Sequence, residues 1–403
     1  MGKTLRRFIN LFLFTALLFF GSTRQVLGQE SIEVVDAQVT HIFGEEIQFS
    51  AQIITSSPIK ESLLIFREVG EENSRVISLN ADEEGRVSYT YDASENFLHP
   101  FDEIIYWFQI ELENGESFTS PKYFFTYTDN RYEWETREAD NLRVHWYKGD
   151  EAFGLSALDT ARVALTDIRL LFPVDTSQPI DIYIYASPNE LQNALFMGGE
   201  TWVAGHADPA LGIVFMAIAP GEQENILMQE YIPHEMAHIL LYRYVGENYN
   251  LLPIWFLEGT ASIAELYPNP DYELALERAT EGETLISIAD LCLTFPREES
   301  EAFLAYAEST SFTRYLYANY GYSGMNDLID AYANGLSCEA GTVSAFGETL
   351  EYLNADWQES VLGANLSGVA FRAILPYLLI LALLIIVPLI SGVFVGTKNP
   401  SER

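Results

Sequence analysis

The first third of the chain alternates short apolar runs with polar turns, a pattern typical of β-strands. Residues 104–112 and 117–127 are two such runs, and Asn114-Gly115 lies between them. Asn-Gly accepts the positive φ angles of a tight hairpin turn. Short strands at this spacing predict an all-β, immunoglobulin-like sandwich over residues 29–128. The region carries no catalytic constellation, so we expect it to act as a spacer, to present substrate or to bind another protein.

Beyond this region the hydrophobic period changes. Residues 129–140 are polar and aromatic, and we interpret them as a linker. Apolar residues then recur at helical spacing between residues 158 and 172. Residues 180–185 and 212–217 are strand-like runs, after which the pattern is mostly helical. Strands followed by helices predict an α+β domain over residues 141–362.

The N-terminal segment has the composition of an export signal. Lys3, Arg6 and Arg7 form a basic start, and the apolar stretch 8–20 that follows is too short to span a membrane comfortably. We therefore expect residues 1–28 to be a signal peptide. The alternative is an anchor that is not cleaved.

A longer apolar stretch lies near the C-terminus. Residues 373–395 carry no charge and are long enough to cross a hydrocarbon core of about 30 Å. They predict a single transmembrane helix, preceded by a juxtamembrane stalk at residues 363–372 and followed by a cytoplasmic tail at residues 396–403. Together with the export signal, this helix places the intervening chain outside the cytoplasm, at the cell membrane.

The formal net charge of −36 bears on possible partners. A chain this acidic repels phosphate backbones, which argues against nucleic-acid binding. The charge otherwise fits a soluble, self-repelling extracellular surface.

The chain contains two cysteines, Cys292 and Cys338. Outside the cytoplasm a pair of cysteines tends to oxidise, so we predict a disulfide between them. A cysteine-based metal site is the weaker alternative, since neither residue lies in a Cys-x-x-Cys motif.

A His-Glu-x-x-His motif carries the clearest chemistry in the chain. Its residues are His234, Glu235 and His238. Residues four apart lie on one face of a helix, so both imidazoles can reach the same Zn²⁺ ion. Glu235 can reach a water molecule at the ion and act as its general base. Pro233 removes one backbone donor, so either the helix begins a few residues earlier or a longer helix from about residue 224 bends there.

A zinc site needs a third protein ligand, and Glu258 is our candidate. It lies twenty positions after His238 in a Trp-x-x-Glu-Gly motif, far enough for one helix to end and another to begin. Gly246 and the polar residues after it supply the turn. These three ligands would hold one zinc ion per chain and leave a position for water.

These motifs resemble the gluzincin zinc metallopeptidases, which include thermolysin and aminopeptidase N, and most closely the bacterial peptidase MA-like domain. In that family the Trp-x-x-Glu-Gly helix is followed by an aromatic helix that ends in Tyr-Gly, here Tyr320-Gly321. The resemblance covers about residues 142–362 and implies a thermolysin-like catalytic domain. The residues that it assigns to the site are the zinc ligands His234, His238 and Glu258 and the general base Glu235.

Two departures from the family pattern refine this expectation. The Gly-x-Met-Glu-Asn motif with which aminopeptidases hold a free N-terminus is absent, so we expect an endopeptidase. Ser262 stands where thermolysin-like enzymes have an Asp that supports a ligating histidine. Another acceptor, such as a backbone carbonyl, must then orient that imidazole.

The resemblance also implies an oxyanion donor after the third ligand. Tyr306, which we place before the Ser-rich start of a helix, is the candidate, and an ordinary packed tyrosine is the alternative. We interpret His206 as a loop residue rather than a ligand. We expect strand 212–217 to pair with extended substrate through main-chain hydrogen bonds.

The sequence therefore predicts a membrane-anchored, extracytoplasmic zinc metallopeptidase that hydrolyses peptide or protein substrates. The alternative is a non-catalytic surface binding or adhesion module on a peptidase-like scaffold. Intact Glu235 argues against that alternative, because loss of peptidase function commonly removes the base or a ligand. An intramembrane protease is excluded because the motif lies far from residues 373–395.

Overall fold

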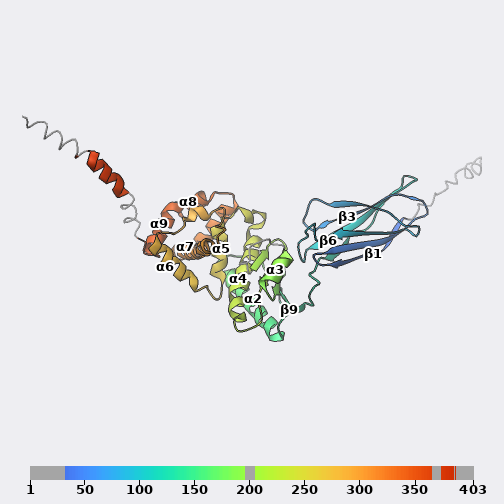
Figure 1. Cartoon of the computed structure of the whole chain (residues 1–403), viewed down its shortest axis with the longest axis horizontal. Helices are drawn as coiled ribbons and strands as arrows, with labels where there is room; N and C mark the ends of the chain where they lie inside the picture. Colours follow the sequence, from blue (N-terminus) through green and yellow to red (C-terminus); the bar gives the residue numbers. More distant parts are fainter. Residues whose placement is uncertain (1–31, 196–204, 365–373, 385, 387–403) are drawn as a thin grey trace, which may run out of the picture. The chain divides into compact units, whose positions relative to one another are not determined.

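The computed structural model divides the chain into two compact units, with the boundary between Arg131 and Tyr132 (Figure 1). Each unit has its own hydrophobic core. The residues that the structure describes are 32–195, 205–364, 374–384 and 386.

The predicted terminal segments fall largely beyond the described residues. The signal peptide (1–28) and the cytoplasmic tail (396–403) lie wholly outside them. Of the predicted membrane helix, residues 374–384 are described, and they are helical. Within the described parts of the chain, no helix combines the length and the apolar character needed to cross a membrane.

The first unit is built from antiparallel strands in two sheets. Its strands are β1 (Glu33–Ile42), β2 (Glu46–Ile54), β3 (Ile59–Glu68), β4 (Arg75–Leu79), β5 (Arg86–Asp92), β6 (Glu103–Leu112), β7 (Ser117–Thr119) and β8 (Tyr123–Thr126). One sheet has the order β1-β2-β5 and the other β4-β3-β6-β7, with β8 also paired to β6. Phe49 of β2 lies 5.0 Å from Phe66 of β3 and 5.3 Å from Tyr106 of β6, measured between ring centroids. The two sheets therefore share one core, and the prediction of a β-rich N-terminal region is confirmed.

The predicted hairpin joins β6 to β7. Its register pairs Gln109 with Thr119 and Glu111 with Ser117. Gly115 in the turn has a φ angle of 89°, which residues with a side chain rarely adopt. The Asn-Gly pair therefore sets this turn through local chain geometry, as expected from the sequence.

The second unit begins with a mixed five-stranded sheet. Its strands are β9 (Glu135–Ala139), β10 (Leu142–Trp146), β11 (Ile180–Tyr185), β12 (Gly205–Asp208) and β13 (Ile213–Ala217), in the order β12-β13-β11-β10-β9. The pairs β10–β11 and β11–β13 are parallel, whereas β9 and β12 run antiparallel to their neighbours. Parallel pairing of β10 and β11 is possible because a long helix, α2 (Glu151–Leu171), connects them.

The predictions for the segments that form the two edge strands, β9 and β12, are wrong. The segment 129–140, which we expected to be a linker, contains β9, whose polar residues pair with β10 at the sheet edge. Strand β13, expected to pair with substrate, is instead an interior strand covered by β12. His206 lies in β12 and not in a loop. These edge strands lack the apolar alternation that marks a half-buried strand, so the sequence pattern did not reveal them.

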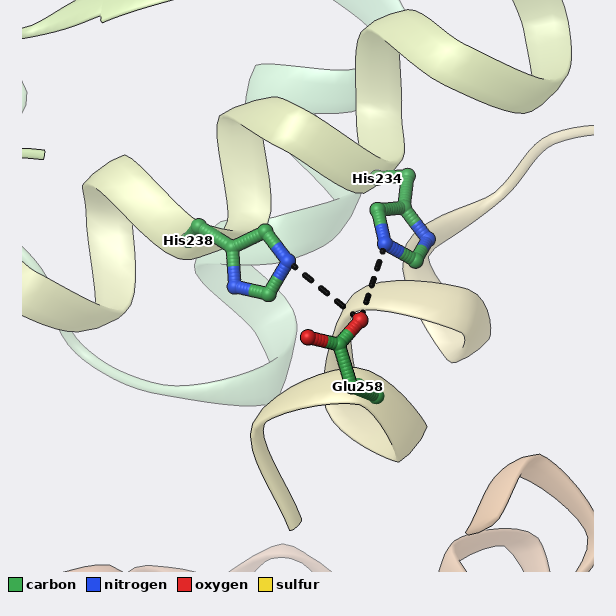
Figure 2. Close-up of side chains that lie close together, drawn as sticks. All are labelled: His234, His238 and Glu258. Carbon is green, nitrogen blue, oxygen red and sulfur yellow. Dashed lines mark ion pairs between the residues drawn. The ribbon is translucent and has the colours of Figure 1, made fainter. Parts of the chain in front are cut away.

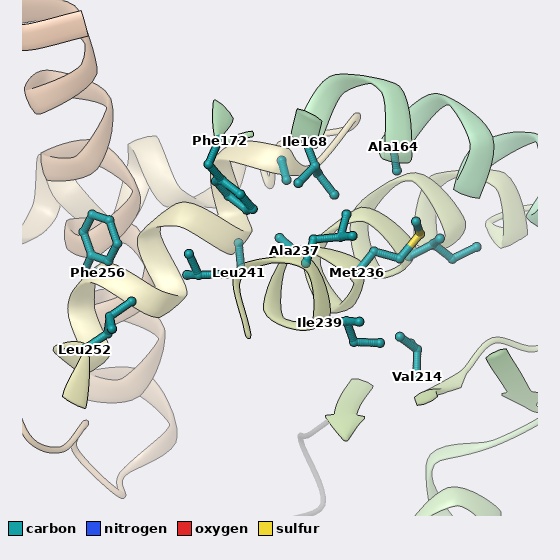
Figure 3. Packing of buried hydrophobic residues seen from close by; sticks show 14 of the residues in the cluster. Ala164, Ile168, Phe172, Val214, Met236, Ala237, Ile239, Leu241, Leu252 and Phe256 are labelled. Atoms are coloured by element: carbon teal, nitrogen blue, oxygen red, sulfur yellow. The ribbon is translucent and has the colours of Figure 1, made fainter. Parts of the chain in front are cut away.

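The rest of the unit is helical. Its helices are α3 (Pro188–Leu195), α4 (Glu224–Val245), the short 3₁₀ helix η1 (Gly246–Leu251), α5 (Ile254–Ala264), α6 (Asp271–Gly282), the 3₁₀ helix η2 (Ile288–Leu291), α7 (Glu299–Ala333), α8 (Cys338–Phe346) and α9 (Leu350–Ser360). Figure 3 shows Ile168 of α2 and Val214 of β13 packed against the stretch of α4 between Met236 and Leu241. This packing buries α4 between α2 and the sheet.

Helix α5 lies close against α7 because of Gly259. A Cβ atom at this position would lie 2.2 Å from Thr313 Oγ1 and 2.5 Å from the Ser309 carbonyl oxygen. The Gly of the Trp-x-x-Glu-Gly motif therefore has a packing role. Helix α7 is interrupted at Gly321, whose φ of 64° and ψ of −176° break the helix at the Tyr-Gly pair singled out in the sequence.

The structure joins Cys292 and Cys338 in a disulfide with an S–S distance of 2.03 Å. The bond lies at the start of α5. The Cys292 carbonyl accepts a hydrogen bond of 3.0 Å from Ile254 N, and the Trp255 indole N–H donates to Cys338 Sγ at 3.2 Å. The disulfide therefore holds the first turn of the helix that carries Glu258.

Replacing both Cys292 and Cys338 with Ser should lower the free energy of unfolding. The cysteines are 46 positions apart. Without the bond the unfolded chain gains conformational entropy, which for a loop of that size lowers the free energy of unfolding by about 3–4 kcal/mol. Urea unfolding followed by circular dichroism measures the change. Reduced wild type serves as control and should match the double variant. An unchanged unfolding midpoint would show that the bond contributes nothing to stability.

Candidate metal centre

Three donor atoms from two helices converge on one point (Figure 2). Glu258 Oε2 lies 3.4 Å from His234 Nε2 and 3.8 Å from His238 Nε2. Two ligands held about 2.1 Å from a tetrahedral zinc ion are separated by about 3.4 Å. The separations therefore fit a shared Zn²⁺ ion, and the residues predicted from the sequence as ligands are brought together.

The opposite nitrogen of each imidazole has its own hydrogen-bond partner. His234 Nδ1 lies 3.0 Å from Glu265 Oε1, and His238 Nδ1 lies 2.8 Å from the Tyr249 hydroxyl. With both Nδ1 atoms engaged, both Nε2 atoms point towards Glu258. This arrangement suits metal binding, because a ligating histidine usually donates its other N–H to an acceptor. The acceptor required in place of the missing Asp is thus a carboxylate, Glu265, and not a backbone carbonyl.

Pro233 helps to explain how Glu265 reaches His234. Helix α4 continues through Pro233, so the longer of the two expected helices is the one observed. Pro has no N–H and leaves the Gln229 carbonyl without its usual helical partner. That carbonyl accepts hydrogen bonds from Leu266 N at 2.9 Å and Tyr267 N at 3.3 Å. The chain that follows α5 is thereby tied to α4 beside Glu265, and neither Glu265 nor this contact was foreseen from the sequence.

Glu235 lies next to the donor triad but is not part of it. Its side chain is buried, and burial raises the pKa of Glu235 to about 7. The positive charge of His234 lowers this pKa, whereas the negative charges of Glu258 and Glu265 raise it further. A Cβ atom at Gly205 would lie 2.3 Å from Glu235 Oε1. Gly205 therefore lets the backbone of β12 approach the carboxylate.

The surroundings shift the pKa values of the three ligand candidates in different directions. Burial alone would raise the pKa of Glu258, but His238 and His234 outweigh it and hold that pKa below its usual range. Burial lowers the pKa of His238 to about 4. Burial would also lower the pKa of His234, but contacts with Glu258 and Glu265 raise it well above its usual value. Zn²⁺ binds an ionised carboxylate and neutral imidazoles, so a proton held by His234 has to leave when the metal binds.

Tyr306 and His206 both lie near the site. Tyr306 is within α7 and not before a helix start, and its ring centroid is 6.4 Å from that of His234. Its hydroxyl donates to Glu258, which contributes to the lowered pKa of that carboxyl. His206, on β12, is close enough for its charge to lower the pKa of His238. The Ser and Thr residues after Tyr306 suggested a helix start there, whereas α7 begins at Glu299 and continues through them.

The first unit holds a second group of possible donors, Glu68, His99 and Asp102. Glu68 Oε1 accepts hydrogen bonds from His99 N at 2.7 Å and lies 3.1 Å from His99 Nδ1. Asp102 Oδ1 accepts from Glu103 N at 2.7 Å. These hydrogen bonds fasten the loop before β6, and they account for the cluster without a metal.

The part of the chain that holds the metal centre matches a known family. The family model of the Peptidase MA superfamily matches residues 160–363, half of the chain, including both histidines and Glu258. The chain belongs to the Peptidase MA superfamily. The resemblance inferred from the motifs is confirmed, and the second unit has a peptidase-like scaffold.

Solved structures match shorter parts of the chain. A bromine derivative of BhCBM56 is 12% identical over 22% of this chain and 88% of its own, with a TM-score of 0.18. Wild-type OgpA from Akkermansia muciniphila is 18% identical over 25% of this chain and 30% of its own, with a TM-score of 0.21. A structure described as a myokine is 16% identical over 24% of this chain and 95% of its own, with a TM-score of 0.20. No curated protein matches the chain.

Proposed function

We propose that this protein is a zinc-dependent endopeptidase. The observation that carries the proposal is the convergence of His234 Nε2, His238 Nε2 and Glu258 Oε2, each fixed by a helix, with both Nδ1 atoms held by acceptors. Three protein ligands and one remaining position are the pattern of catalytic zinc sites. The superfamily match supports the same conclusion.

The residues around the centre suit peptide hydrolysis. The chemistry that a bound Zn²⁺ supplies is polarisation of the scissile carbonyl and of the attacking water. Glu235 accepts the proton from that water and passes it to the leaving amine. Tyr306, whose hydroxyl lies at Glu258, would donate a hydrogen bond to the oxyanion that develops on the carbonyl oxygen once Glu258 binds the metal.

An extended substrate would pair with β12. This edge strand adjoins the base, since its Gly205 lies against Glu235. An extended peptide that adds to a sheet edge gains main-chain hydrogen bonds without a free terminus. This geometry supports cleavage within a chain, in agreement with the missing aminopeptidase motif.

The same proposal includes the location of the enzyme. Residues 1–28 would direct export and residues 373–395 would anchor the chain in the cell membrane, with the catalytic unit outside the cytoplasm. Apolar side chains on the helical residues 374–384 are exposed, for example Leu383 and Leu384, which supports an apolar environment there. We further propose that the first unit is an immunoglobulin-like module that binds substrate or another protein.

Zinc content and peptide digestion of the purified full chain in detergent test the proposal. We expect about one zinc per chain by elemental analysis and cleavage of internal bonds in a peptide library followed by mass spectrometry. Cleavage should stop after chelation and return with added zinc. Folded protein without zinc would overturn the proposal. Zinc without cleavage of any peptide would favour the non-catalytic binding module.

A further inference from the structure

The connection between the two ligand helices folds back onto the metal centre. Helix α4 carries His234 and His238, and α5 carries Glu258. Between them, η1 places Tyr249 with its hydroxyl 2.8 Å from His238 Nδ1. The Tyr249 carbonyl accepts a hydrogen bond of 3.1 Å from Leu252 N, which leads into α5. One residue of the turn therefore contacts both a ligand and the entrance to the helix of another ligand.

The direction of the Tyr249 contact follows from the chemistry of imidazole. A neutral imidazole carries one proton, and the nitrogen without it is the one that binds a metal. For His238 Nε2 to bind zinc beside Glu258, its Nδ1 must carry the proton and donate it to the Tyr249 oxygen. The other tautomer would have Tyr249 donate to Nδ1 and would leave a proton on Nε2, where the metal belongs.

The surroundings of Tyr249 hold its ring in place, and a phenol is neutral at pH 7. The ring packs edge-on against Tyr242 of α4, with 5.8 Å between centroids. The hydroxyl is thus a neutral acceptor held in place, whereas the partner of His234 is the carboxylate of Glu265.

We propose that Tyr249 is a positioning residue that fixes the tautomer and the ring orientation of His238, so that zinc is bound through Nε2. The inference rests on the proposed zinc function and adds a residue to which no motif points. Since a neutral acceptor forms a weaker hydrogen bond than a carboxylate, the contribution of Tyr249 should be smaller than that of Glu265.

Tyr249→Phe, which removes the hydroxyl and keeps the ring, tests the proposal in the full chain. Loss of a hydrogen-bond partner of a ligating histidine weakens metal binding by about 10–100-fold. We expect a loss near the lower end of that range for Tyr249→Phe and a larger loss for Glu265→Gln, both measured by chelator competition. Tyr242→Phe, which removes a neighbouring hydroxyl that does not contact His238, should bind zinc like the wild type.

Two further readouts separate positioning from packing. Nuclear magnetic resonance of zinc-loaded protein labelled with ¹⁵N-histidine gives the chemical shift of the His238 Nδ1–H proton. The value typical of a hydrogen-bonded proton should be lost in Tyr249→Phe and kept in Tyr242→Phe. Tyr249→Leu removes the ring as well. If zinc binding weakens in Tyr249→Leu but stays within twofold of wild type in Tyr249→Phe, the ring and not the hydroxyl matters, and the inference is overturned. Wild type that binds no zinc would overturn the proposed function together with this inference.

Discussion

Glu235→Gln should lower kcat/KM by about 10²–10⁴-fold, the usual contribution of a general base, while zinc content stays at that of the wild type. Glu235 is not one of the three donors, so its loss leaves the ligand set intact. Gln is the suitable replacement because the space beside Gly205 is tight and the amide has the shape of the carboxylate. An amide cannot accept the proton from water, which is why turnover should fall.

Steady-state cleavage of a fluorogenic peptide, with elemental analysis of the same sample, measures both quantities. Glu247→Gln is the matched control, since Glu247 is an exposed carboxylate in η1 just after α4. It should retain wild-type activity and zinc. If Glu235→Gln cleaves peptides as fast as the wild type, then Glu235 is not the base and the proposed chemistry is wrong.

Glu258→Ala should abolish zinc binding at concentrations that saturate the wild type. Deleting a direct ligand should cost more than the roughly 10–100-fold lost with a hydrogen-bond partner of a ligand. Removing the carboxylate also leaves two adjacent imidazoles without the negative charge that they share. Activity should fall with the metal.

A thermal shift provides a readout of zinc binding that does not depend on activity. A ligand that binds the folded state alone stabilises it by about 2.7 kcal/mol when its free concentration is 100 times Kd. Added zinc should therefore raise the Tm of the chelated wild type and leave that of Glu258→Ala unchanged. Glu277→Ala, an exposed position on α6, is the control and should respond as the wild type does. An equal zinc response in Glu258→Ala would remove Glu258 from the ligand set.

The ligand candidates could be predicted because their geometry is local. His234 and His238 are one helical turn apart, and any helix through them places both rings on one face. Glu258 followed from a motif and from a spacing long enough for a turn. The hairpin at Asn114-Gly115 is local in the same sense, since it depends on the φ angles that two residues accept.

Other parts of the fold and the site depend on contacts between distant segments. Strand β9 has no apolar alternation and becomes a strand through its pairing with β10. Strand β12 lies at the sheet edge beside Glu235, so the strand expected to meet substrate is covered. No local pattern could have indicated which of the two strands forms the edge.

The sequence by itself determined the chemistry: two imidazoles and a base at helical spacing, a third carboxylate and a pair of cysteines. The tertiary structure decided what orients those groups. Glu265 reaches His234 because the carbonyl freed by Pro233 holds the chain after α5, and Tyr249 reaches His238 because η1 turns back onto α4. Helical periodicity relates residues a few positions apart, whereas these partners lie 31 and 11 positions away in sequence and meet only when the helices pack.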